Sequence, residues 1–239
     1  MKLSVLGSSS KGNCYLIHSP DEALIIETGI RLSEVKKTLN FKINHIRGVL
    51  VSHSHGDHSK YCREYAQAGL KVLAPVDVFL APHNNYRPVQ PGKGYTLGRF
   101  QVIPFQVEHD VPCYGYIVNH PDTGKIVFLT DTYLSKYTFK DVNHFLVEAN
   151  YCDEILDENI SKGRVHPSQK QRLFMTHMEL KTTKELLKAN DLSQTRTIVL
   201  IHLSDGNSHQ DRFISEIKDL TGKPVYAADN GFEIDLTMF

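Results

Sequence analysis

Four side chains able to bind a metal ion follow one another in the segment His53-Ser-His55-Gly-Asp57-His58, directly after an apolar run. Neutral imidazoles and carboxylates both need polar partners when buried, so packing alone does not account for this group. Zinc or another first-row divalent cation suits such nitrogen and oxygen donors. The spacing lets His53 and His55 point the same way and displaces Asp57 and His58 towards a second ion. The segment therefore predicts a metal site; the alternative is a chance group of surface histidines.

The apolar pattern along the chain predicts the elements that position this segment. Strands are expected where short apolar runs alternate with turn residues, and helices where apolar residues recur every three or four positions. The expected strands cover 2–7, 13–18, 23–28, 47–53, 70–74, 95–97, 100–108, 114–119, 125–131, 197–202 and parts of 224–236. The expected helices cover 31–39, 61–68, 76–81, 179–190 and a segment through Phe213, Ile217 and Leu220. Near the end, Asn230-Gly231 is a hairpin signal. This alternation predicts an α/β fold in which two β-sheets pack together with helices outside, built from two similar halves.

The pattern His-x-His-x-Asp-His after a strand resembles the hallmark of the metallo-β-lactamase-fold hydrolases. The resemblance can be followed along nearly the whole chain. It implies a four-layer αββα sandwich of two mixed β-sheets flanked by helices, formed by residues 1–239 as a single domain. In that family two more histidines and a bridging aspartate follow at strand ends, and His109, Asp131 and His202 occupy such positions here.

The same resemblance implies a site for two divalent metal ions, most simply zinc, with manganese as the alternative. The implied ligands are His53, His55 and His109 for one ion, Asp57, His58 and His202 for the other, and Asp131 as the bridge between them. Two such ions about 3.5–4 Å apart lower the pKa of a shared water, which yields a metal-activated hydroxide for hydrolysis. Glu27 stands where the family more often has an aspartate that supports the metal-binding loop.

Within the family, the second half of this chain is similar to the RNase Z branch. The similarity lies in Glu148-Ala149-Asn150, in Met175-Thr176-His177 and in His202-Leu203-Ser204. It implies that His177 is the general acid for the leaving oxygen, that Glu148 orients His177 and raises its pKa, and that Asp57 orients or deprotonates the attacking water. The residues after His177 are Met-Glu-Leu, whereas RNase Z commonly has small hydroxyl residues there.

A Gly/Ser-rich segment opens the chain, Gly7-Ser-Ser-Ser-Lys-Gly-Asn-Cys14. A loop of this kind between two strands can turn backbone N–H groups towards an anion, and a plain tight turn is the alternative. The segment closely resembles the opening of the YycJ (WalJ) group of metallo-β-lactamase-fold proteins, which are phosphodiesterases or nucleases. Phage proteins that degrade cyclic mononucleotides to defeat the Pycsar defence have a related fold. Phosphodiester cleavage is therefore the activity that these resemblances share.

The charge balance bears on the size of the substrate. Lysine and arginine number 27, and aspartate and glutamate also number 27, so the formal net charge is zero. Nucleic-acid polymers are held by many basic contacts, and this chain has no dense basic run. We therefore expect a small nucleotide phosphodiester, such as a cyclic nucleotide, with nuclease or exonuclease action on DNA or RNA ends as the alternative. Candidate base-stacking residues are Tyr86, Tyr114, Tyr133 and Tyr151.

Two other function classes stay open at this point. A lactonase or thioesterase would use the same metal ions for acyl transfer, and a non-catalytic binding module would keep the ligands without turnover. Since the longest apolar stretches run only about four to six residues, against roughly 20 in a bilayer span, we expect no membrane helix. The start of the chain does not read as a secretion signal, and Cys14, Cys62, Cys113 and Cys152 are widely spaced, which favours reduced thiols in the cytoplasm. A homodimer is expected from similar proteins alone.

Overall fold

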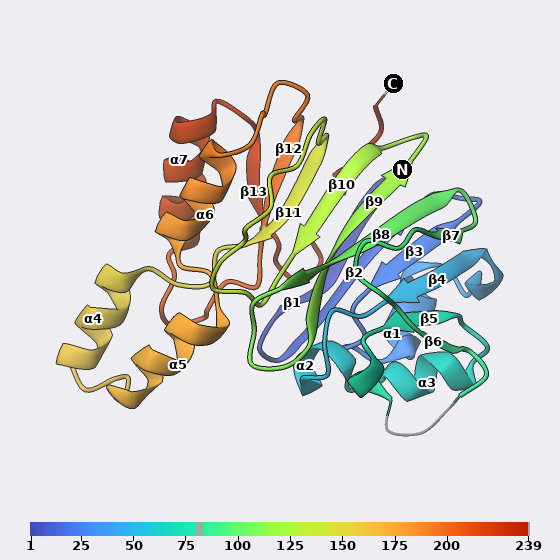
Figure 1. Ribbon diagram of the computed structural model, residues 1–239, viewed down its shortest axis with the longest axis horizontal. Coiled ribbons are helices and arrows are strands. Elements are labelled where there is room, and N and C mark those ends of the chain that lie inside the picture. Colours follow the sequence, from blue (N-terminus) through green and yellow to red (C-terminus); the bar gives the residue numbers. More distant parts are fainter. Residues whose placement is uncertain (80–82, 239) are drawn as a thin grey trace.

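Two seven-stranded β-sheets lie face to face, with helices on both outer faces (Figure 1). The computed structural model describes residues 1–79 and 83–238. The first sheet has the order β14-β1-β2-β3-β4-β5-β6 and the second the order β13-β12-β11-β10-β9-β8-β7. The strands of the first are β14 (Glu233–Asp235), β1 (Lys2–Ser9), β2 (Gly12–His18), β3 (Ala23–Ile26), β4 (Ile46–Leu50), β5 (Val72–Ala74) and β6 (Tyr86–Pro88). Those of the second are β13 (Val225–Ala227), β12 (Thr197–Ile201), β11 (His144–Glu148), β10 (Gly124–Leu129), β9 (Cys113–His120), β8 (Phe100–Val107) and β7 (Tyr95–Leu97).

Each sheet is antiparallel over one half and parallel over the other. Strands β14 to β3 and β7 to β10 pair antiparallel, whereas β3 to β6 and β10 to β13 pair parallel. Parallel strands need a crossover between them, and the helices provide several of these crossovers on the outer faces. The helices are α1 (Leu32–Thr38), α2 (Gly56–Ser59), α3 (Cys62–Gln67), α4 (Asp153–Ser161), α5 (Ser168–Thr176), α6 (Leu180–Lys188) and α7 (Gln210–Thr221). Two mixed sheets built alike agree with the prediction of two similar halves.

Three buried apolar clusters separate four layers of structure. One cluster lies between the two sheets, where Tyr15 of β2 meets Phe128 of β10 at 5.3 Å between ring centroids. A second joins the outer face of the first sheet to α1 and α3, and the third joins the second sheet to α6 and α7. Alternating strand residues face these clusters, as a sheet covered on both sides requires. The predicted four-layer αββα sandwich is confirmed.

The chain departs from the predicted elements at several places, and the strands β6 and β11 and the short helix α2 are not among those expected. Asn230-Gly231 does not close a hairpin: β13 pairs with β12 in one sheet and β14 with β1 in the other, so this turn carries the chain between sheets. There Gly231 N–H donates to Val5 O, and Ala228 N–H donates to Leu200 O. Helices α4 and α5 were not expected, and they project together from one side of the sandwich (Figure 1). Of the helix expected over 76–81, a 3₁₀ turn covers Val76–Val78, and 80 and 81 lie outside the described residues.

Two sequence expectations concern the environment of the chain. Within residues 1–79 and 83–238, no helix is both long enough and apolar enough to cross a membrane. Cys14, Cys62, Cys113 and Cys152 are all buried and carry free thiols. Burial raises the pKa of Cys14 and of Cys62 to about 12, so these thiols are protonated at neutral pH. These cysteines therefore behave as small packing residues. That residues 1–239 form a single domain stays a prediction.

Candidate metal centre

The predicted ligands gather at one edge of the two sheets because each follows the carboxyl end of a strand. The first sheet supplies the segment that follows β4 and holds His53, His55, Asp57 and His58. From the second sheet, β8, β10 and β12 are followed by His109, Asp131 and His202 respectively. Open α/β sheets commonly place their sites outside the carboxyl ends of strands. The centre is thus assembled from both sheets.

Hydrogen bonds from the second sheet hold the segment that precedes the ligands. Tyr116 OH donates to Val51 O at 2.6 Å, and Tyr114 N–H donates to Ser52 O at 3.0 Å. Both residues belong to β9, so this strand fixes the extended backbone after β4. The Glu27 carboxylate accepts the Ser52 N–H at 3.2 Å, which gives this glutamate the supporting place that the sequence predicted for it.

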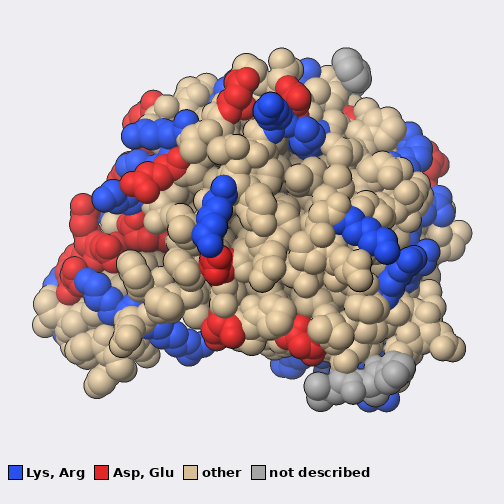
Figure 2. Space-filling model, in the orientation of Figure 1, with Lys and Arg blue, Asp and Glu red and all other residues tan. Residues whose placement is uncertain are grey.

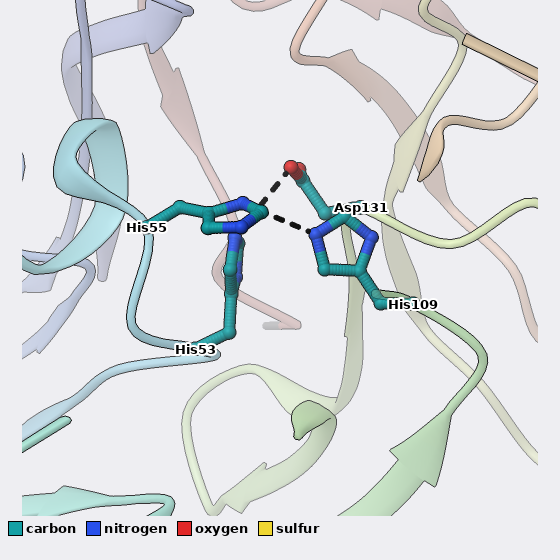
Figure 3. Close-up of side chains that lie close together, drawn as sticks. All are labelled: His53, His55, His109 and Asp131. Atoms are coloured by element: carbon teal, nitrogen blue, oxygen red, sulfur yellow. Dashed lines mark hydrogen bonds and ion pairs between the residues drawn. The ribbon is translucent and has the colours of Figure 1, made fainter. Parts of the chain in front are cut away.

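One group of donors consists of His53, His55, His109 and Asp131, whose ligand atoms all lie within 4.8 Å of one another. Figure 3 shows these four side chains converging, with His53 and His55 on one loop and His109 and Asp131 each on another. His109 Nε2 lies 3.3 Å from His55 Nδ1, and His53 Nε2 lies 3.7 Å from Asp131 Oδ2. Ser52 Oγ contacts His53 Nδ1 at 2.8 Å and so directs Nε2 of that ring towards the group.

A second group consists of Asp57, His58 and His202, again within 4.8 Å of one another. Asp57 Oδ2 lies 3.2 Å from His58 Nε2 and 3.3 Å from His202 Nε2. Burial alone would lower the pKa of His202, but Asp131, Asp57 and Glu148 outweigh it and raise that pKa to about 10. A divalent cation between these atoms would displace a proton from the imidazole, because a metal-bound histidine must be neutral.

Asp131 lies between the two groups. Its Oδ2 faces His53, whereas its Oδ1 lies 3.4 Å from His58 Nε2 and 3.5 Å from His202 Nδ1. Burial would raise the pKa of Asp131, but the histidines around it hold that pKa well below the usual range. Thr130 Oγ donates to Asp131 Oδ1 at 2.7 Å and fixes the orientation of the carboxylate. One oxygen towards each group is the geometry that a bridging ligand needs.

The predicted pair Glu148 and His177 adjoins this carboxylate. His177 Nδ1 lies 2.8 Å from Glu148 Oε1 and 3.9 Å from Asp131 Oδ2. The same Glu148 Oε1 lies 3.1 Å from His202 Nδ1, so one fully buried oxygen serves both rings. Burial lowers the pKa of His177, but the charge and hydrogen bond of Glu148 outweigh this effect and raise it overall. With Nδ1 engaged, Nε2 is the nitrogen that can exchange a proton with a ligand.

The backbone at three of these residues is left-handed. Glu27, Asp131 and His202 have φ angles of 71°, 49° and 54°, and each comes directly or nearly directly after a strand. This conformation is sparsely populated by residues other than glycine and asparagine, and such positions concentrate at functional sites. The backbone changes direction there, at or just after the ends of β3, β10 and β12, and all three residues are buried. The sequence offers no signal for it.

Sequence reasoning placed the seven predicted ligands near one another but missed two neighbours. Asn13 Nδ2 lies 3.1 Å from His58 Nε2 and donates to Asp57 Oδ2 at 3.3 Å. Asp110 Oδ1 lies 3.0 Å from His109 Nε2 and 3.4 Å from His55 Nε2, at the more exposed end of the first group. Asn13 lies within the Gly/Ser-rich motif, and Asp110 directly follows the predicted ligand His109. Their positions next to these features in the sequence are the signal that could have identified both residues.

The candidate base-stacking tyrosines do not form one platform. Tyr151 is only 2% exposed and takes part in a bridge to Glu179, so it is not available to a nucleobase. The prediction for Tyr151 is therefore wrong, because this residue packs beneath the start of α6. Tyr86 stacks on Phe79 at 4.2 Å between ring centroids. Tyr114 and Tyr133 are partly exposed.

The donors fit a pair of divalent cations. Among the described residues, His53 Nε2 is buried without a hydrogen-bond partner although it points into the first group. A buried orphan nitrogen is costly unless a ligand occupies its lone pair. The mixture of imidazole and carboxylate donors suits zinc or another first-row divalent ion. The donor chemistry therefore agrees with the metal site that the sequence predicted.

Comparison with known proteins decides the family. The sequence profile of the metallo-beta-lactamase superfamily matches residues 9–132, more than half of the chain. This chain belongs to the metallo-beta-lactamase superfamily. The resemblance predicted from the His-x-His-x-Asp-His segment is confirmed. Together, the superfamily and the donor groups indicate a metal-dependent hydrolase.

Relatives within the superfamily cover the full length of the chain. Exodeoxyribonuclease YycJ of Bacillus anthracis is 26% identical over 252 residues, with 98% of this chain and 94% of YycJ covered. The metallo-beta-lactamase fold protein YhfI from Bacillus subtilis has a TM-score of 0.72 at 18% identity, over 98% of this chain and 99% of YhfI. The short form of human tRNase Z has a TM-score of 0.62 at 16% identity, over 100% of both chains. At these identities the two solved structures show the shared fold alone.

Proposed function

We propose that this chain is a phosphodiesterase that uses two divalent metal ions to release nucleotides from DNA ends. The observation that carries the proposal is the Glu148–His177 pair, which lies against the same Asp131 that faces both donor groups. A phosphodiester has a poor alkoxide leaving group, and a positioned acid beside the metal site answers that need. Acyl hydrolysis of a thioester has no comparable demand, because a thiolate leaves without a proton.

Each group of residues has a part in this proposal. His53, His55 and His109 would hold one cation, Asp57, His58 and His202 the other, and Asp131 would bridge them. Zinc is the proposed metal, with manganese as the alternative. Two cations in these places would lower the pKa of a water and offset negative charge on the phosphate. Asp57, the carboxylate of the second group, has a side chain that is 22% exposed and would orient that water.

His177 would deliver the proton. Glu148 engages Nδ1, so the proton for the leaving oxygen would come from Nε2. Glu148 itself accepts N–H groups from Met178 at 3.2 Å and Thr132 at 3.3 Å, which fixes its carboxylate in the buried interior. Since Glu148 touches no substrate in this arrangement, it acts as a positioning residue for the imidazole.

The choice of DNA ends is supported by the full-length relation to exodeoxyribonuclease YycJ. A small cyclic nucleotide is the second candidate, and the surface charge agrees with either substrate. On the face drawn in Figure 2, lysine and arginine are interspersed with aspartate and glutamate, and no broad basic area covers that face. An enzyme that binds only a chain end needs few phosphate contacts, so this charge pattern suits both candidates better than a nuclease acting along a duplex. The homodimer and the cytoplasmic location stay predictions from the sequence.

A first experiment tests the reaction class. Protein loaded with zinc or manganese is incubated with bis-p-nitrophenyl phosphate, 3′,5′-cyclic nucleotides and end-labelled DNA and RNA. We expect metal-dependent turnover that is lost in the double variant His53→Ala/His55→Ala. The matched control, His45→Ala/His166→Ala, removes two histidines outside the centre and should keep the activity. Absence of phosphodiester turnover with either metal, together with turnover of lactones or thioesters, would overturn the proposal.

A second experiment tests the role of His177 through the leaving group. Glu148→Gln and His177→Ala should lower kcat for a nucleotide diester by about 100-fold or more, as loss of a general acid does. A p-nitrophenolate leaves without protonation, so the same variants should affect bis-p-nitrophenyl phosphate much less. Equal losses on both substrates would show that His177 does not protonate the leaving oxygen.

A further inference from the structure

A polar pocket adjoins the metal centre on the side of the second donor group. Its volume is about 500 Å³, and its walls come from the β1–β2 turn, from the loop between β12 and α7, and from the crossing between β13 and β14. Pockets of roughly 300–1,000 Å³ accommodate small organic ligands. The room is therefore sufficient for one nucleoside.

The walls of this pocket are continuous with the candidate ligands. Leu203 and Ser204 line it and directly follow His202, whose N–H donates to Ser8 Oγ, another lining residue, at 2.9 Å. Next along the chain, Ser9 O accepts a hydrogen bond at 3.1 Å from the Asn13 amide, which also donates to Asp57 Oδ2 at 3.3 Å. A single amide group thus links the pocket wall to the second donor group, so a ligand in the pocket adjoins a phosphate at the metal centre.

The lining favours an uncharged polar ligand over a phosphate. Its charged groups are one lysine, Lys11, and two aspartates, Asp205 and Asp229. Lys11 Nζ is bound to Asp205 Oδ2 at 2.7 Å, an ion pair that joins the β1–β2 turn to the loop after β12. The remaining Asp229 would repel an anion. A phosphate is therefore disfavoured in the pocket itself.

The neutral part of the lining suits a sugar and a base. Hydroxyl and amide side chains offer donors and acceptors, namely those of Ser9, Ser204, Ser208, Gln210 and Asn230. Apolar groups of Leu6, Ile30 and Leu203 lie among them, and none of the described residues that line the pocket is aromatic. Recognition here would thus proceed through hydrogen bonds to the edges of the ligand and not through stacking.

We propose that this pocket is the subsite for the nucleoside attached to the scissile phosphate. The inference rests on the proposed function and deepens it, because it assigns the nucleotide specificity to residues 203–210 and 228–230 together with the β1–β2 turn. Edge recognition by side-chain amides and hydroxyls discriminates between bases, so the enzyme would distinguish nucleosides by more than their size. The subsite would serve a DNA end and a cyclic nucleotide alike.

The test compares two chromogenic diesters that share the p-nitrophenolate leaving group. Bis-p-nitrophenyl phosphate carries no nucleoside, whereas the p-nitrophenyl ester of thymidine 5′-monophosphate carries one. Gln210→Trp fills the pocket from the first turn of α7, and Gln67→Trp makes the same change on the exposed surface of α3. We expect Gln210→Trp to lower the ratio of kcat/KM for the thymidine ester to that for the nucleoside-free ester by about tenfold, the loss typical of one binding contact. Gln67→Trp should leave that ratio unchanged.

A binding measurement reports on the pocket without turnover. Saturation-transfer NMR of metal-free protein with thymidine should show transfer to the base and sugar protons, and Gln210→Trp should abolish it. An unchanged kcat/KM ratio and persistent transfer in Gln210→Trp would overturn the subsite while leaving the phosphodiesterase proposal intact. If neither diester is turned over by the metal-loaded wild type, the proposed function fails, and the thymidine signal alone then decides whether the pocket binds nucleosides.

Discussion

Removing Asp131 should cost the protein both metal ions, whereas removing His109 should cost it one. Asp131 Oδ2 faces His53 in the first donor group, and its Oδ1 faces His58 and His202 in the second. His109 belongs to the first group alone. We therefore expect two bound cations per chain in the wild type, one in His109→Ala and none retained in Asp131→Ala.

The thermal stability should follow the same steps. A ligand present at 100 times its dissociation constant stabilises a fold by about 2.7 kcal/mol. In a chain of this size each kcal/mol raises the melting temperature by about 2–4 °C. Each bound cation should thus add about 5–11 °C, so the gain on adding metal should be halved in His109→Ala and absent in Asp131→Ala.

Two measurements together check this prediction. Elemental analysis after dialysis gives the number of metal ions per chain, and differential scanning fluorimetry with and without added zinc gives the shift in melting temperature. Each variant is compared with its own metal-free form, which removes the effect of the substitution on the apo fold. If Asp131→Ala retained one ion with an unchanged melting shift, Asp131 would belong to one group only, and the bridging geometry would be refuted.

Two further predictions concern the fold around the centre. A Cβ at Gly29 would lie 1.8 Å from Asp57 O, so Gly29→Ala must displace the loop that carries Asp57. We expect this variant to lose activity and about 2 kcal/mol or more of unfolding free energy. Gly94→Ala is the control and should be unaffected, because nothing lies within 4 Å of a Cβ at that position. Burial lowers the pKa of His144 to about 4, so the unfolded chain takes up a proton there before the folded chain does. Stability should therefore fall from about pH 6.5 towards pH 4 by about 3 kcal/mol through this residue. Urea unfolding across this range should show a drop smaller by that amount in His144→Gln; equal drops in both proteins would contradict the assignment.

Strand ends were predictable because the sequence marks them twice. The buried strands β8, β10 and β12 read as apolar runs, and the polar residue that follows each of them stands out, which is how His109, Asp131 and His202 were found. Parallel pairing brings the ends of β10 and β12 to one edge, and β8 ends at the same edge because β8 and β10 both run antiparallel to β9. A sequence with this alternation therefore carries most of the information about which residues meet.

What the sequence could not supply depends on relations across space. The Asn230-Gly231 signal correctly marks a turn, but a local pattern does not say that the strands on either side belong to different sheets. Helices α4 and α5 were missed because few of their residues are buried, so their apolar periodicity is weak. The sequence suggests that the Tyr151 ring is accessible, because residue type alone does not determine whether a side chain is buried. The pocket beside His202 likewise combines three segments that are far apart in the chain.

The left-handed backbone at Glu27, Asp131 and His202 affects which substitutions these positions accept during evolution. Each residue of this kind costs about 1–3 kcal/mol that glycine or asparagine would relieve at least in part. Random substitution under pressure for folding of the metal-free chain alone would therefore tend to erase all three, and that metal-free chain would become more stable. A lineage that keeps an acid, an acid and a histidine at these positions is held there by a requirement other than folding. Loss of the centre during evolution should thus leave glycine or asparagine at these three positions, in a chain that is more stable than the metal-free form of this one.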